Sequence, residues 1–361
     1  MMNIRHISTI VTVAVAAVTL TACGGRRGQA SNKATDAKHS VALITDGNGV
    51  NDHSFNQSAW NGFLAYGKAH QLKRGQNGYQ YFQSGSAADF DNNFSQAVAA
   101  GYHTMFGVGY SLKTAVSTAA KKYPKKNFVI IDDVVSGQKN VASANFKSEQ
   151  ASYLAGVVAA HETKTNTIGF IGGVHGDIDD LFDAGFTQGV TDTAKKLHKH
   201  IKLLNQYIGS FDAVDKAKAI AQAMYTKKAD IIFHAAGGAG DGLFAEAKAI
   251  NQTRPANKKV WVIGVDVDQS NLANYHAKGN QKDNFALTSV ITGVNVAVKD
   301  ISERAYHDKF PGGQNLIYGL KNDGVSLTRG QISSQAWIAA QKARTNIING
   351  KIKVRIHPLS K

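Results

Sequence analysis

Short apolar segments alternate with longer amphipathic segments along most of the chain. Nine apolar runs have the length and residue types of strands, and polar or glycine-rich residues separate them. These predicted strands cover residues 41–45, 79–82, 104–108, 128–131, 167–171, 203–208, 230–235, 260–265 and 285–290. Between most of them, apolar residues recur every three or four positions, which predicts helices. The clearest predicted helices cover residues 115–122, 149–161, 213–225 and 295–306.

Strands that alternate with helices predict an α/β fold, because right-handed crossovers join parallel strands. Nine strands are too many for one small sheet, so we predict two doubly wound lobes with parallel sheets of four or five strands. The lobes are joined by a hinge of several crossings, expected near Phe146, after the strand 285–290 and near Tyr318. We assign residues 40–146 plus 284–317 to the first lobe and residues 147–283 plus 318–361 to the second.

The first 39 residues differ from this pattern. Arg5 precedes an apolar run (7–20) that is short for a membrane span, and the sequence LTAC follows. This ending resembles a bacterial lipobox, in which the cysteine is acylated. We therefore predict a lipoprotein signal peptide over 1–23 with lipidation at Cys23, the only cysteine in the chain, and a flexible tether over 24–39. Ordinary secretion with an unrelated cysteine is the alternative.

Composition narrows the classes of function. Of the 361 residues, 43% are hydrophobic and 19% are charged, which predicts a packed globular body. A single cysteine excludes an internal disulfide and a cysteine-based zinc site. The net charge of +15 favours an anionic membrane surface or cell wall. Nucleic acid is the other interpretation of this charge, but the lysines are scattered over predicted helices without interleaved aromatic residues, so we expect no nucleic-acid partner.

An aspartate stands at the end of three apolar runs: Asp46, Asp132 and Asp266. In doubly wound sheets, ligands bind at the carboxyl ends of strands. Two of these aspartates belong to the predicted first lobe and one to the second, so facing lobes would place all three in one cleft. Carboxylates only accept hydrogen bonds, so they suit the hydroxyls of a sugar or the amines of a base and repel phosphate. Each aspartate alone is explained equally well by a turn or a helix cap.

Two loops and one further aromatic residue extend this candidate site. The glycine-rich loop 237–242 follows a strand and would let backbone N–H groups approach a ligand, although a tight turn explains it equally well. It fits neither a dinucleotide motif nor an ATP motif. Phe55 would stack on a planar ring, or else be a buried anchor of a helix that Asp52 or Ser54 caps. Phe182, near another helix start, would supply the opposite stacking face.

The sequence has no nucleophile elbow, zinc-protease motif or cysteine nucleophile. The acidic run 175–180 lacks the spacing of a calcium loop and is interpreted as a solvated loop. The histidines are scattered and form no ligand-spaced cluster. We therefore expect no catalytic residue, no cofactor and no metal site.

The order of these motifs resembles the basic membrane protein (Bmp/Med) lipoproteins, a family that includes purine nucleoside receptors. The most specific segments are DHSFN (52–56) and FKSEQASYLAG (146–156), and the resemblance covers essentially the whole mature chain. It implies a type I periplasmic-binding-protein fold and a non-enzymatic substrate receptor of an ABC importer. It also implies stacking of the base between Phe55 and Phe182, and ribose contacts from Asp266 and the 237–238 loop. The ligand contacts that it implies are Asp46, Phe55, Asn56, Asp132, Phe182, Gly238 and Asp266.

Two positions depart from the family pattern. Thr292 stands where the family usually has lysine, and Asn295 stands where it has aspartate. Threonine is shorter and neutral, so the ribose contact and the counter-charge to Asp266 would change. Thr292 is therefore a further candidate contact, and we expect either a ligand other than a plain purine nucleoside or a lower affinity.

We predict a monomeric receptor, anchored by lipid to the extracytoplasmic face of the cell membrane. It would capture a nucleoside, expected to be a purine nucleoside, by closing its lobes, and present it to an ABC transporter permease. Two alternatives stay open. One is a nucleoside hydrolase that uses the clustered aspartates, and the other is a surface adhesin or sensor with a vestigial cleft.

Overall fold

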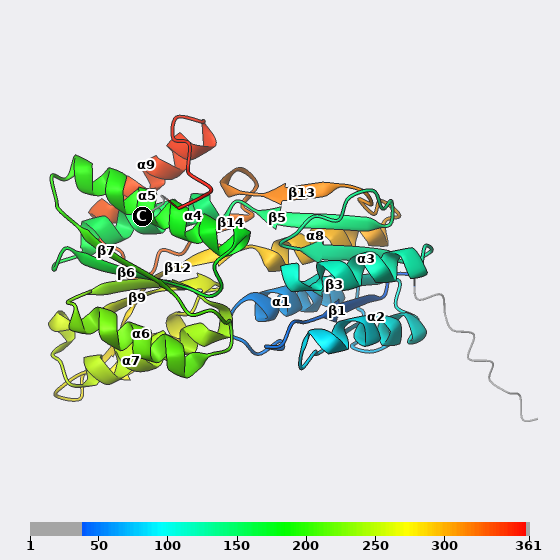
Figure 1. Cartoon of the computed structure of the whole chain (residues 1–361), viewed down its shortest axis with the longest axis horizontal. Helices are drawn as coiled ribbons and strands as arrows, with labels where there is room; N and C mark the ends of the chain where they lie inside the picture. The colour runs from blue at the N-terminus through cyan, green and yellow to red at the C-terminus, as the bar shows by residue number, and fades with distance from the viewer. Residues whose placement is uncertain (1–37, 359–361) are drawn as a thin grey trace, which may run out of the picture. The chain divides into compact units, whose positions relative to one another are not determined.

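The computed structural model describes residues 38–358, so the predicted signal peptide, the lipidation at Cys23 and nearly all of the tether lie outside the described residues. Within this range the apolar runs form two six-stranded sheets, each covered by helices on both faces (Figure 1). No helix in the described part of the chain is both long and apolar enough to cross a membrane.

The first sheet has the strand order β13-β5-β4-β3-β1-β2, and all its neighbouring strands are parallel. Its strands are β1 (Val41–Ile44), β2 (Tyr79–Phe82), β3 (Thr104–Val108), β4 (Asn127–Ile131), β5 (Val141–Phe146) and β13 (Asn315–Tyr318). Helices α1 (Phe55–Ala69) and α8 (Val294–Tyr306) cover one face, and α2 (Phe90–Ala99) and α3 (Lys113–Lys122) cover the other. Strand β1 is apolar on both faces because helices bury both.

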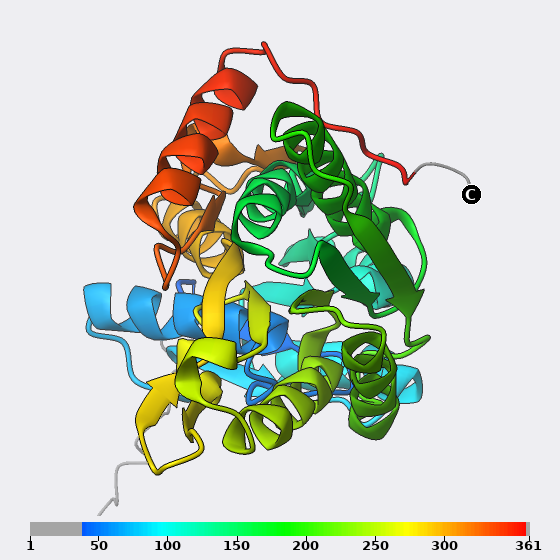
Figure 2. The ribbon, with the colours of Figure 1, turned by 90° about the vertical axis from the view of Figure 1, so that its left-hand side faces the viewer.

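The second sheet has the order β14-β12-β9-β8-β6-β7, and only the pair β12–β14 is antiparallel. Its strands are β6 (Thr167–Gly172), β7 (Lys202–Tyr207), β8 (Ile231–Ala235), β9 (Trp261–Asp266), β12 (Ala286–Thr292) and β14 (Val325–Leu327). Helices α4 (Ser148–Glu162), α5 (Asp177–Lys196) and α9 (Ser334–Ile348) lie on one face, and α6 (Val214–Thr226) and α7 (Asp241–Gln252) on the other (Figure 2). A small hairpin, β10 (Asn274–His276) and β11 (Lys282–Asn284), is added to this lobe.

The chain passes between the two sheets three times: after β5, after β12, and between β13 and β14. These are the three places predicted from the sequence. The assignment of residues 284–292 to the first lobe is wrong, because β12 pairs with β9 of the second sheet. The expected four or five strands per sheet are also too few. The short strands β13 and β14, which form after the second and third crossings, complete one edge of each sheet.

Helices α4 and α5 of the second lobe approach each other closely at glycines. A Cβ added at Gly185 would lie 2.1 Å from the backbone oxygen of Glu149, and one added at Gly189 would lie 2.2 Å from that of Tyr153. Both distances are far below van der Waals contact, so only glycine allows this packing. The close approach fixes α5, whose first turns face the other lobe.

We expect Gly185→Ala to lower the free energy of unfolding by about 1–3 kcal/mol, because the methyl group must push two packed helices apart. Gly176→Ala is the matched control, since its backbone is extended (φ 165°) and no atom lies within 4 Å of the added carbon. The control should change stability by less than about 0.5 kcal/mol. Urea denaturation measures both values, and equal midpoints for the two variants would contradict the close packing.

Candidate functional site

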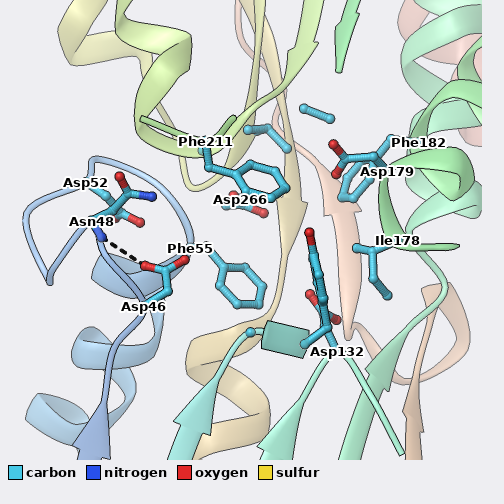
Figure 3. Close-up of a pocket in the computed structure, with 15 residues that line it drawn as sticks. Asp46, Asn48, Asp52, Phe55, Asp132, Ile178, Asp179, Phe182, Phe211 and Asp266 are labelled. Carbon is cyan, nitrogen blue, oxygen red and sulfur yellow. Dashed lines mark hydrogen bonds between the residues drawn. The ribbon is translucent and has the colours of Figure 1, made fainter. Parts of the chain in front are cut away.

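The carboxyl ends of strands from both sheets meet at one pocket between the lobes (Figure 3). The space between the lining residues is about 580 Å³, counting the part that is open to solvent. The first lobe contributes Asp46, Asn48, Asp52, Phe55, Gly109, Tyr110 and Asp132, and the second contributes Ile178, Asp179, Phe182, Phe211, Ala235, Gly237, Val265 and Asp266.

The three strand-end aspartates come together at this pocket, as their positions in the sequence predict. Asp46 follows β1, Asp132 follows β4, and Asp266 is the last residue of β9. The backbone of Asp132 (φ 63°) and that of Asp266 (φ 65°) is left-handed, a conformation that aspartate tolerates better than most residues. Phe55 and Phe182, the two predicted stacking residues, line the same pocket from opposite lobes.

Asp52 fixes the start of α1 and, through Asn56, the position of Asp46. Its carboxylate accepts hydrogen bonds from the backbone N–H groups of Asn56 and Gln57, both at 2.9 Å, as expected of a helix cap. The Asn56 side-chain amide donates to Asp52 Oδ2 at 3.1 Å and to Asp46 Oδ1 at 2.8 Å. Asn56 therefore lies behind the pocket wall and orients Asp46.

Thr292 also lies behind the lining residues, and the partly exposed Gly238 lies beside them. Gly238 faces the loop of the first lobe, where an added Cβ would be 3.7 Å from Asn48 Oδ1. The buried Thr292 hydroxyl lies close enough to Asp266 to favour its charged form, but it makes no hydrogen bond of standard geometry. Contact of Asn56, Gly238 or Thr292 with a ligand stays a prediction.

Residues 53–54 of the first lobe connect the two lobes beside the pocket. The Ser54 hydroxyl donates to Asp266 Oδ2 at 2.5 Å, and Gln269 Nε2 donates to the backbone oxygen of His53 at 2.9 Å. His53 Nδ1 also lies 3.2 Å from Asp241 Oδ2. Ser54, one of the two predicted helix caps, therefore bonds across the cleft instead of capping α1 with its side chain.

Asp179 is a pocket residue that the sequence analysis placed in a solvated loop. That interpretation is wrong, because residue 177 begins α5 and Asp179 is only 4% exposed. Its Oδ2 accepts a hydrogen bond from the backbone N–H of Val174 at 2.7 Å. A signal was available, because Asp179 precedes Phe182 by three residues and residues at this spacing share one helix face.

Two aromatic residues of the pocket were also missed. Tyr110 comes from the first lobe and Phe211 from the second, and their ring centroids are 6.4 Å apart. Phe211 lies just beyond the end of β7, so its place after a strand was a usable signal. With Phe55 and Phe182, each lobe supplies two rings to the pocket.

Burial raises the pKa of the pocket aspartates. It raises the pKa of Asp132 to about 8, with a further contribution from the nearby Asp266 carboxylate. The pKa of Asp266 is raised to about 6 by burial, although the Ser54 hydroxyl opposes the shift. Burial also raises the pKa of Asp179 well above its ordinary range, and that of Asp46 to a smaller degree. The pocket therefore favours protons or donor groups that relieve its negative charge.

Comparison with known proteins identifies the family of this chain. The sequence profile of the Bmp family, described as "ABC transporter substrate-binding protein PnrA-like", matches residues 38–357. The chain belongs to this family. It is 46% identical to the "ABC transporter nucleoside-binding protein BmpA" of Lactococcus lactis subsp. cremoris, over 97% of this chain and 99% of the relative. It is 31% identical to "Basic membrane protein A" of Borreliella burgdorferi, over 87% of each chain.

A solved structure of an ABC transporter solute-binding protein from Aeropyrum pernix K1 has a similar fold. Its TM-score is 0.75 at 21% sequence identity, and the match covers 89% of this chain and 94% of that structure. The predicted type I periplasmic-binding-protein fold is confirmed. The Bmp family consists of substrate-binding proteins, which agrees with the prediction of a receptor and not an enzyme.

We expect Asp132→Asn to stabilise the ligand-free protein. The folded carboxyl has a pKa of about 8 against an ordinary value of 3.8, so the native state of the wild type loses stability as the pH rises from about 4 to about 8. Asparagine stays neutral and avoids this loss. At pH 8 the melting temperature of the variant should be about 2–4 °C above that of the wild type, which corresponds to about 1 kcal/mol in the free energy of unfolding. The difference should vanish towards pH 4.

Differential scanning calorimetry at several pH values measures this effect. Asp215→Asn removes an exposed carboxylate on α6 and is the matched control, for which we expect no pH-dependent difference from the wild type. A lower melting temperature of Asp132→Asn at pH 8 would contradict the proposed charge penalty.

Proposed function

We propose that this protein captures a nucleoside between its two lobes. The observation that carries the proposal is that Phe55 and Phe182 line one pocket from opposite lobes, together with the strand-end aspartates. Aromatic faces stack on a planar base, and carboxylates accept hydrogen bonds from ribose hydroxyls. The same carboxylates repel phosphate, so a nucleoside fits better than a nucleotide. The likeness to a relative described as nucleoside-binding supports this assignment.

Capture requires the lobes to close over the ligand. A ligand that contacts both lobes binds the closed arrangement more tightly than the open one, and so shifts the population towards closure. The bond from Ser54 to Asp266 crosses the cleft next to the pocket and holds the two lobes together in this arrangement. Asp266 thereby couples the ligand site to the closed arrangement.

We further propose that the protein is a monomeric lipoprotein that delivers its ligand to an ABC transporter permease. The lipobox-like ending at Cys23 supports a lipid anchor on the extracytoplasmic face of the cell membrane. Membership in a family of ABC transporter substrate-binding proteins supports the permease as partner. The basic net charge of the chain adds attraction to an anionic membrane surface.

We expect Phe55→Ala and Phe182→Ala each to weaken nucleoside binding by a factor of about 5–150, because the loss of one stacking contact costs about 1–3 kcal/mol. Isothermal titration calorimetry with inosine and adenosine measures the affinities. Ile338→Ala, at an α9 position that is 67% exposed, is the control and should bind as the wild type does.

Unchanged affinity in both phenylalanine variants would contradict the site. The same samples also test the hydrolase alternative. Inosine should be recovered intact after prolonged incubation, whereas release of the free base would show an enzyme.

We expect Cys23→Ser to release the protein from membranes, because the variant lacks the thiol that carries the lipid. Cell fractionation and detergent partitioning measure this change. Ser31→Ala, in the predicted tether, leaves the lipobox intact and is the matched control, which should stay in the membrane fraction. Equal membrane association of the two variants would contradict a lipid anchor at Cys23.

A further inference from the structure

The pocket carries acidic groups from both lobes without a basic partner. Asp46 and Asp132 face it from the first lobe, and Asp179 and Asp266 face it from the second. Among the described residues that line the pocket, none is lysine or arginine. The side chain that lies behind Asp266 is the neutral hydroxyl of Thr292. A neutral ligand would therefore leave these carboxyl groups either protonated or charged without a counter-charge.

Asp132 is the pocket residue that most clearly lacks a hydrogen-bond donor, which a ligand could supply. The residue is only 8% exposed. Burial and the neighbouring carboxylates of Asp266 and Asp133 act on its carboxyl group, and no hydrogen bond within the described part of the chain does. Asp46 uses only one oxygen, Oδ1, which accepts from Asn48 and Asn56. Buried polar groups in native proteins normally have partners, so unpartnered carboxyl oxygens in a pocket point to donors on the ligand.

The aromatic residues of the pocket favour positive charge as well. Four rings surround the site, those of Phe55, Tyr110, Phe182 and Phe211. The face of an aromatic ring carries negative charge and attracts a cation, the more strongly when water is excluded. Asp179 precedes Phe182 by three residues on α5, so a carboxylate lies next to one of the stacking rings. Both groups therefore favour a planar ring with positive charge.

We infer that the pocket prefers nucleosides whose base carries a positive charge, and that Asp132 and Asp179 set this preference. The inference rests on the proposed nucleoside-binding function and names the class of nucleoside. Asp132 suits this role because its carboxyl group has no hydrogen-bond partner within the described chain, and Asp179 suits it because it lies next to the Phe182 ring. A cationic base would supply the counter-charge that the protein itself lacks at this site.

The test compares two ligands of nearly the same shape that differ in charge. Nicotinamide riboside has a positively charged pyridinium ring, and in benzamide riboside a carbon atom replaces the ring nitrogen, so the ring is neutral. We expect the wild-type protein to bind nicotinamide riboside at least about tenfold more tightly by isothermal titration calorimetry, as expected for a charge near a poorly solvated carboxylate. Adenosine is titrated in parallel as a common neutral nucleoside.

Variants of Asp132 and Asp179 test whether these two residues set the preference for a positively charged base. In Asp179→Asn the amide oxygen can still accept the hydrogen bond from Val174, so the variant removes charge and keeps the turn. We expect the ratio of the two affinities to fall about tenfold in Asp179→Asn and in Asp132→Asn, whatever each variant does to the affinity for benzamide riboside itself. Asp215→Asn removes an exposed charge on α6 and should leave the ratio unchanged.

The outcomes separate this inference from the proposed function. Adenosine binding with equal affinities for the two matched ribosides would overturn the charge preference and leave nucleoside binding in place. A preference that neither aspartate variant reduces would overturn the assignment to Asp132 and Asp179. No binding of any of the three nucleosides would overturn both proposals.

Discussion

The parallel direction of the strands is the constraint on which this structure depends. Because neighbouring strands in the first sheet all run the same way, and only β14 departs in the second, their carboxyl ends gather at one edge of each sheet. Loops and helix starts that follow these strands are then brought together although they are far apart in the sequence. Asp46 and Asp266 meet in one pocket across 220 positions for this reason. Their loops can vary without disturbing the sheets, which helices bury on both faces.

The buried carboxyl groups of this pocket can bind a ligand, but they lower the stability of the folded protein. Carboxyl groups removed from water destabilise the folded chain unless they are protonated or receive hydrogen bonds. Asp46 is partly compensated by Asn48 and Asn56, and Asp266 by Ser54, whereas Asp132 has no such partner within the described chain. This carboxyl group keeps its proton up to about pH 8, and it is the part of the site to which a ligand can supply a partner on binding. In the proposed function, affinity and closure of the lobes arise from the same interactions.

The close contact of α4 and α5 shows how the second lobe holds its part of the site. Glycines at the contact let the two helix backbones approach, and this fixes the direction of the first turns of α5. Asp179 and Phe182 lie on those turns, so their positions depend on packing that begins one turn away, at Gly185. A rigid support of this kind suits a receptor whose lobes move as bodies about a hinge.

The sequence by itself determined the α/β class, most of the strands, the three crossings and the five pocket residues Asp46, Phe55, Asp132, Phe182 and Asp266. These follow from hydrophobic periodicity and from the place of a residue after a strand or, for Phe182, near a helix start, which are local properties. Only the tertiary structure decided that β12 belongs to the second sheet, because an apolar strand fits either sheet until its partner is known. It also decided that Asp179 is a buried pocket residue, that Asn56 and Thr292 lie behind the wall, and that Gly238 lies beside it. Burial depends on what the other lobe places against a residue, whereas a local pattern, such as the spacing of Asp179 and Phe182, shows only which residues share a face.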